Sequence, residues 1–158
     1  MHFACHGTQD LENPLDSSLI LTDGRLKVSD IMRQPDGDNT LDIKKTMSLA
    51  FLSACETAKG DKTVPDEAMH LAATLLFAGF RGVVATMCYT RAINDLDGPK
   101  IADTFYEYLF KNCDPNSNPP VLPDLRQSAK ALHLAVAKLR QETDIPFRRW
   151  VPFVHYGL

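Results

Sequence analysis

Four short apolar segments along the chain predict β-strands. Residues 2–6, 47–54 and 81–87 have strand length, and the second and third are almost continuously apolar, as strands covered on both faces of a sheet require. Residues 150–156 form the fourth segment. Its Pro152 favours an edge position or the start of a strand, because proline donates no hydrogen bond to a neighbouring strand.

A hairpin is predicted between the first two of these strands. Two β-prone stretches, 18–21 and 25–28, flank an Asp-Gly pair at 23–24, and Asp-Gly favours the tight turns that join antiparallel strands. Ser29 or Asp30 then caps a short helical turn.

Three longer segments have helical periodicity. The first begins at Pro65 and ends at Gly79, the second begins at Asp97, and the third begins at Pro123, positions that suit helix starts and a helix end. Apolar residues recur three or four positions apart, as on one face of a helix. The expected stripes are Ile101, Phe105, Tyr108 and Leu109 in the second helix, and Leu125, Ala129, Leu132, Val136 and Leu139 in the third.

The alternation of strands and helices predicts an α/β domain with a mostly parallel central sheet. A chain of 158 residues is long enough for one domain with one sizeable core. We therefore expect a single domain over residues 1–158, with polar loops near 34–45 and 112–122.

Composition narrows the function classes. The chain is 44% hydrophobic and 23% charged with a net charge of −3, so clustered positive charge for nucleic acid or anionic membranes is not indicated. No segment has the length of a membrane span, and none resembles a signal peptide. The four cysteines lack metal-type spacing, so we expect no metal or other cofactor. A chain with a core of this size does not need disulfides for stability, which favours a reducing cytoplasmic location. These cysteines are Cys5, Cys55, Cys88 and Cys113.

Candidate chemistry follows two of the predicted strands. His6 and Gly7 come just after the first apolar segment, and Cys55 comes just after the second. If the two strands are parallel neighbours, the imidazole and the thiol meet at the edge where α/β sheets bind ligands. A nearby imidazole can convert a thiol into the reactive thiolate. His2 shares a face with His6, so the choice of His6 depends on the turn at Gly7 and on the family resemblance described next.

Several strings of this chain resemble one known family. HFACHG, SLILTDGRLKVSDI, LAFLSACETAKGD, PDEAMHLAATLLFAGFRGVVATM and WVPFVHYGL are similar to the CHAT domain, a caspase-like (clan CD) family of cysteine peptidases. The resemblance implies a three-layer sandwich around the central sheet. It also implies an endopeptidase in which Cys55 attacks the peptide bond of a protein or peptide substrate and His6 shuttles the proton. The backbone N–H groups of Gly7 and Cys55 would form the oxyanion hole.

The chain departs from the family pattern in two respects. The family has strands before the histidine motif, so we expect N-terminal strands to be missing and an upstream domain or partner chain to complete the sheet. Cys88 also stands where the family usually has tryptophan after the VVATM strand, which changes the expected substrate cleft.

Four further residues are weaker candidates for the site. Asp95 and Asp97 could bind a basic substrate side chain, although a solvated loop charge and a helix cap are the simpler interpretations. Glu67 and His70 lie on one stripe of the first long helix with Thr74. They are either a second layer beneath the site or a polar seam whose members bond to one another.

Other functions remain open at this point. Cys55 could be a buried structural cysteine, since free cysteines are often buried. The domain could be a catalytically inactive interaction or scaffold module, a self-pairing fragment that needs a partner, or another thiol hydrolase or transferase that uses the same pair.

Overall fold

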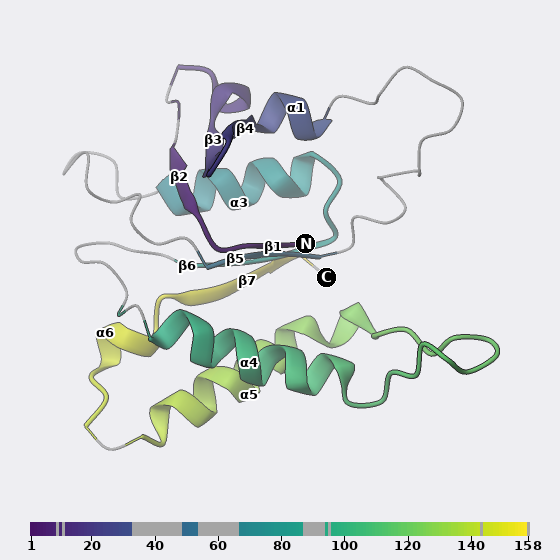
Figure 1. The fold of residues 1–158 in the computed structure, drawn as a ribbon. Coiled ribbons are helices and arrows are strands. Elements are labelled where there is room, and N and C mark those ends of the chain that lie inside the picture. The colour runs from purple at the N-terminus through teal and green to yellow at the C-terminus, as the bar shows by residue number, and fades with distance from the viewer. Residues whose placement is uncertain are drawn as a thin grey trace.

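The architecture is that of a sheet between two layers (Figure 1). The computed structural model describes residues 1–8, 10, 12–32, 49–53, 67–86, 94, 96–142 and 144–157. In that part of the chain the central sheet has the strand order β1-β5-β6-β7. The first three strands in that order run parallel, and β7 is antiparallel to β6. The strands are β1 (His2–Phe3), β5 (Leu49–Leu52), β6 (Gly82–Thr86) and β7 (Phe153–Gly157).

These strands confirm the expected mostly parallel sheet. Every residue of β5 and β6 is buried, as continuous apolar runs between two covering layers should be. Pro152 comes immediately before β7, which is the last strand of this sheet in the described part of the chain, so the position predicted from proline chemistry is correct.

Helices and a small second sheet cover the two faces (Figure 1). On one face lie α4 (Asp97–Phe110) and α5 (Ser128–Arg140), with η3 (Leu125–Gln127) leading into α5 and α6 (Phe147–Trp150) following it. On the other lie α3 (Glu67–Phe77) and a small second sheet. That sheet has the order β2-β3-β4 and is antiparallel. Its elements and neighbours are β2 (His6–Thr8), η1 (Pro14–Asp16), β3 (Ser18–Leu21), β4 (Gly24–Lys27) and α1 (Val28–Met32).

The central sheet separates two hydrophobic cores. Phe51 points toward α4, where its ring lies 5.0 Å from that of Phe105. Its neighbours Ala50 and Leu52 point to the opposite side, where they pack with Leu75 of α3. This alternation follows from the two-residue period of a strand, and it fixes which side chains of β5 face each layer.

The first predicted strand was wrong in its extent. Only His2 and Phe3 pair with β5, after which the chain bends at Cys5 and His6–Thr8 pairs with β3 of the second sheet. A hydrogen bond of 2.8 Å between the Thr8 and Ser18 hydroxyls ties β2 to β3. The segment predicted as one strand is therefore divided between two sheets. Local periodicity cannot distinguish this arrangement from one continuous strand.

Helix ends were predicted best where a local motif decides them. Gly79 has a φ of 109°, its N–H bonds to Leu76 O, and the N–H of Phe80 bonds to Leu75 O. This is the Schellman arrangement, in which a glycine in the left-handed region ends a helix. The predicted end of α3 at Gly79 is confirmed.

Three local boundaries differ from prediction. The hairpin turn is Thr22-Asp23, because Leu21 pairs with Gly24. The last long helix begins at Ser128 after a 3₁₀ turn, so Ala129 is exposed while Ala131 and Leu132 are buried. Trp150 belongs to α6 rather than to the final strand. Each of these shifts is small, and none changes the order of elements.

The predicted loops differ in what can be said of them. Residues 34–45 lie outside the described residues. Within 112–122, Asp114 and Val121 form an isolated antiparallel bridge, so this polar excursion folds back on itself. None of the helices in the described part of the chain is long and apolar enough to cross a membrane.

Candidate functional site

Two chain segments leave the central sheet together at the same rim. β1 and β5 are parallel neighbours, and the Ser53 N–H donates a 3.0 Å hydrogen bond to Phe3 O where the strands end. His6 lies three residues beyond Phe3, and Cys55 lies two residues beyond Ser53. Three residues span at most about 11 Å and two at most about 7 Å. The predicted adjacency of the two strands is confirmed, while Cys55 itself lies outside the described residues.

His6 occupies a different element from the one predicted. It begins β2 opposite Ile20 and is exposed, while Gly7 is buried opposite Leu19. Residues that pair directly across two strands share a face, so His6 and Ile20 lie together on the outer face of the second sheet. The imidazole is thus displaced from the end of β1 into the strand that follows it.

A groove of about 700 Å³ runs beside His6. One side is formed by residues 2–6 and the other by residues 20–23 of the hairpin. Cys5 is half-buried there, and burial raises the pKa of its thiol. A thiol with a raised pKa stays protonated and unreactive, which fits the interpretation of Cys5 as a packing residue.

His2 has its own partners at the same rim. Its Nε2 lies 3.0 Å from Ser53 Oγ, and its ring lies 4.9 Å from Phe51 and 5.6 Å from Tyr106. Burial, followed by the charge of the amino terminus, lowers the pKa of His2. His2 therefore favours its neutral form and holds the end of β5, a contact that sequence reasoning missed. The one signal in the sequence was the hydroxyl of Ser53 at the end of an apolar strand, which needs a hydrogen-bond partner.

Asp97 proves to be the anchor of α4. Its carboxylate is fully buried and receives both Nε (2.7 Å) and Nη2 (2.5 Å) of Arg149. No side-chain hydrogen bond caps the helix at Leu96, so the capping interpretation of Asp97 is not supported. Asp97 holds the start of α4 against α6 instead of facing a pocket for a basic side chain. Arg149 is 52 positions away, so no local pattern could indicate this pair.

A comparison with known families identifies the chain as a whole. The family model for the CHAT domain matches residues 1–158. The chain belongs to the CHAT domain family. CHAT domains are caspase-like and are associated with peptidase function, and the layered α/β architecture agrees with that fold. A comparison with curated proteins finds no match.

The structure does not describe the side chains of the remaining residues predicted for the site of this CHAT domain. Asp95 and Cys88 lie outside the described residues, and so do the side chains of Glu67 and His70, whose backbone begins α3. Among the described residues, no group of three or more His, Cys, Asp or Glu is arranged to hold a metal ion.

Proposed function

We propose that this CHAT domain is a cysteine endopeptidase that uses Cys55 as nucleophile and His6 as general base. The observation that supports the proposal most directly is the hydrogen bond from Ser53 to Phe3, which joins the two strand ends that precede His6 and Cys55 in the sequence. Cytoplasmic conditions would keep the required thiol reduced.

The proposed reaction has two stages. His6 takes the thiol proton, and the Cys55 sulfur forms a bond to the peptide carbonyl carbon. His6 then gives the proton to the departing amine as the C–N bond breaks, which leaves a thioester that water hydrolyses with His6 again as base. Backbone N–H groups of Gly7 and Cys55 would stabilise the oxyanion, and each such donor is typically worth about 3 kcal/mol.

The structure favours His6 over His2 as the base. His2 lies within β1 and is bonded to Ser53, with its ring against Phe51 and Tyr106. His6 follows the end of β1, is exposed and lines the groove. A base must approach substrate and nucleophile together, and an exposed side chain that lines the groove is more accessible to a substrate than the ring of His2, which packs against Phe51 and Tyr106 and is partly desolvated.

A peptide probe with a thiol-reactive acyloxymethyl ketone tests this proposal. We expect wild-type protein and the Cys5→Ala control to be labelled, while Cys55→Ala is not labelled. His6→Gln should slow labelling at least about 10-fold, in line with the usual contribution of a general base. Equal labelling of Cys55→Ala and wild type would remove Cys55 as the nucleophile.

A non-catalytic interaction module is the second candidate. The observation that favours it is the place of His6 in β2, where pairing with Ile20 of β3 constrains its backbone. Under this alternative, correctly folded wild-type protein would show no probe labelling and no cleavage of any peptide in a random substrate library.

A further inference from the structure

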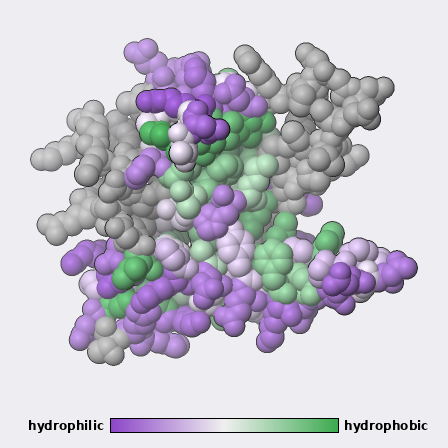
Figure 2. All heavy atoms as spheres, viewed as in Figure 1, coloured by the Kyte–Doolittle hydropathy of each residue, from purple (hydrophilic) through white to green (hydrophobic). Residues whose placement is uncertain are grey.

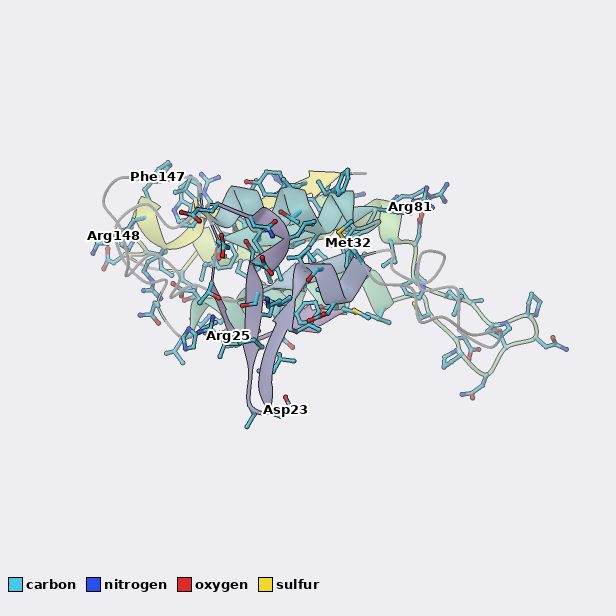
Figure 3. All side chains as sticks on the ribbon, turned by 90° about the horizontal axis from the view of Figure 1, so that it is seen from above. Asp23, Arg25, Met32, Arg81, Phe147 and Arg148 are labelled. Carbon is cyan, nitrogen blue, oxygen red and sulfur yellow. The ribbon has the colours of Figure 1, made fainter. Side chains whose placement is uncertain are left out.

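The loop between α4 and η3, residues 111–124, projects from the body of the molecule. It extends beyond the ends of α4 and α5 (Figure 1) and stands out at the lower right of the space-filling view (Figure 2). Seen from above, it again reaches past the neighbouring helices (Figure 3). The structure describes every residue from 96 to 142, so the loop and the helices on either side of it lie within the described part of the chain.

Hydrogen bonds fix the shape of this loop. Asp114 and Val121 exchange two backbone hydrogen bonds, of 3.1 and 2.9 Å. Between them, the Ser117 hydroxyl lies 2.8 Å from the carbonyl oxygens of both Asp114 and Pro119, and it accepts a 3.1 Å hydrogen bond from the Val121 N–H. A segment that is ordered before binding loses less conformational entropy when it binds. The loop is therefore preorganised for contact with a partner.

The second half of the loop, residues 119–123, has the sequence PPVLP. Each proline fixes its φ at about −65°, and Leu122 favours extended backbone because it precedes a proline. The next residue after the segment, Asp124, is also extended, with φ −81° and ψ 94°. These constraints favour the polyproline II helix, which has three residues per turn. The first and fourth residues of PPVLP then form one row, and the second and fifth form another.

The segment is apolar and open to solvent. Its first two prolines are exposed, and Leu122 is 74% exposed, so covering these side chains is favourable. No lysine or arginine lies in residues 112–125, and the Arg126 guanidinium donates two hydrogen bonds to the Asp124 carboxylate. Nucleic acids and anionic membranes attract clustered cations, so neither suits this surface.

The segment can accept hydrogen bonds but has few to donate. Three of its five residues are prolines, which have no N–H, and the N–H of Val121 is bonded to Asp114 and Ser117. The same segment of a second copy would lack donors for the same reason. A partner that fits must supply the donors together with apolar surface. Tryptophan and tyrosine do both, because each combines an aromatic ring with a donor.

We propose that residues 119–123 dock into a groove lined with aromatic side chains on a partner domain. The two rows of the segment fill neighbouring spaces between the rings, and its carbonyl groups accept hydrogen bonds from tryptophan or tyrosine. Grooves of this kind on SH3, WW and EVH1 domains bind P-x-x-P segments, because the polyproline II helix is formed before binding. Pro120 and Pro123 have this spacing. The docking role does not depend on the proposed peptidase chemistry.

An array of purified SH3, WW and EVH1 domains, probed with the full chain, tests the proposal. We expect at least one domain to bind, and isothermal titration calorimetry measures its affinity. The Pro120→Ala/Pro123→Ala variant should bind at least about tenfold more weakly, as truncation of central contact residues usually causes. The matched control Pro115→Ala removes an exposed proline of the same loop outside the motif, and its affinity should be unchanged.

Two further measurements need no variant of the protein. A synthetic peptide of residues 117–125 should compete with the chain for the same domain, whereas the peptide with alanine in place of Pro120 and Pro123 should not. In NMR spectra of the partner domain, the indole N–H signals of the groove should shift when the chain binds, since tryptophan donates to the segment.

Five results would overturn the proposal. The first is that no domain of the array binds the chain, and the second is equal binding of wild type and the double variant. The third is an equal loss of affinity in Pro115→Ala, and the fourth is competition by the alanine peptide as strong as that by the native peptide. The fifth, self-association of the chain that the double variant abolishes, would identify a second copy as the occupant.

Discussion

At the scale of single residues, two ion pairs connect α4 to the C-terminal part of the chain in different environments. Asp97–Arg149 has side-chain exposures of 0% and 28%, whereas Lys100–Glu142 has 43–45% for both partners. A buried charge that loses its partner keeps its desolvation penalty, while an exposed pair exchanges its partner for water. The two pairs therefore differ in their effect on stability, although both link the first turns of α4 to segments beyond α5.

Asp97→Ala should lower the free energy of unfolding by about 3 kcal/mol, because it leaves the partly buried Arg149 without its carboxylate. Asp97→Asn, which keeps the volume, should cost less. Urea denaturation measures both. The matched control Glu142→Ala should cost no more than about 1 kcal/mol, and equal losses for Asp97→Ala and Glu142→Ala would contradict the anchoring role of Asp97.

At the scale of elements, α5 and β7 are joined by a polar contact within a largely apolar interface. Ser128 Oγ lies 2.8 Å from His155 Nε2, and Ser128 is fully buried. Burial lowers the pKa of His155, so the folded state binds a proton less readily than the unfolded chain. Above a pH of about 6.5, the pKa of histidine in the unfolded chain, His155 is neutral in both states and stability is not reduced. As the pH falls from there toward the lower pKa of the folded state, the unfolded chain takes up the proton first, so the free energy of unfolding decreases.

The free energy of unfolding should therefore decline between pH 7 and pH 5, and His155→Gln should reduce that decline. His2, whose pKa is also lowered, acts in the same direction, so the variant removes only part of the effect. Chemical denaturation at several pH values provides the measurement. His133→Gln, an exposed position on α5, is the control, and an unchanged slope in His155→Gln would refute the role assigned to His155.

Elements with a decisive local signal were predictable from sequence, and elements that depend on distant partners were not. The apolar stripe of α4, the glycine end of α3 and the buried strands β5 and β6 each depend on residues close in the chain. The division of residues 2–8 between two sheets depends on β3 and β5 together. For the candidate site, the sequence predicted that two neighbouring strands end at one edge of the sheet. It could not predict the contact between His2 and Ser53, because these residues are 51 positions apart.

At the scale of the whole molecule, the central sheet has a separate hydrophobic core on each face. Phe105 of α4 is fully buried in the core on one side, while Leu75 of α3 is fully buried in the other. Alternate residues of β5 belong to different cores, so loss of packing on either side weakens the same strand. We therefore expect the cores to unfold together in a single transition, as small domains usually do.

Phe105→Ala should lower stability by about 3–5 kcal/mol, since it opens a large cavity in a packed core. Phe110→Ala, on the same helix but 51% exposed, should cost less than about 1 kcal/mol. Thermal unfolding followed by near- and far-UV circular dichroism would check both values. Two resolved transitions in Phe105→Ala would show that the cores are independent units.

The central claim is that the thiol of Cys55 and the imidazole of His6 act as a pair at the rim shared by β1 and β5. The most direct test is the pH dependence of Cys55 alkylation by iodoacetamide, with the modified residue identified by mass spectrometry. A paired thiol should react as a thiolate well below the ordinary cysteine pKa of about 8.5, and His6→Gln should slow its reaction at pH 6.5 at least about tenfold, whereas His2→Gln should not. Reaction that rises only near pH 8.5 and is the same in wild type and His6→Gln would contradict the pairing.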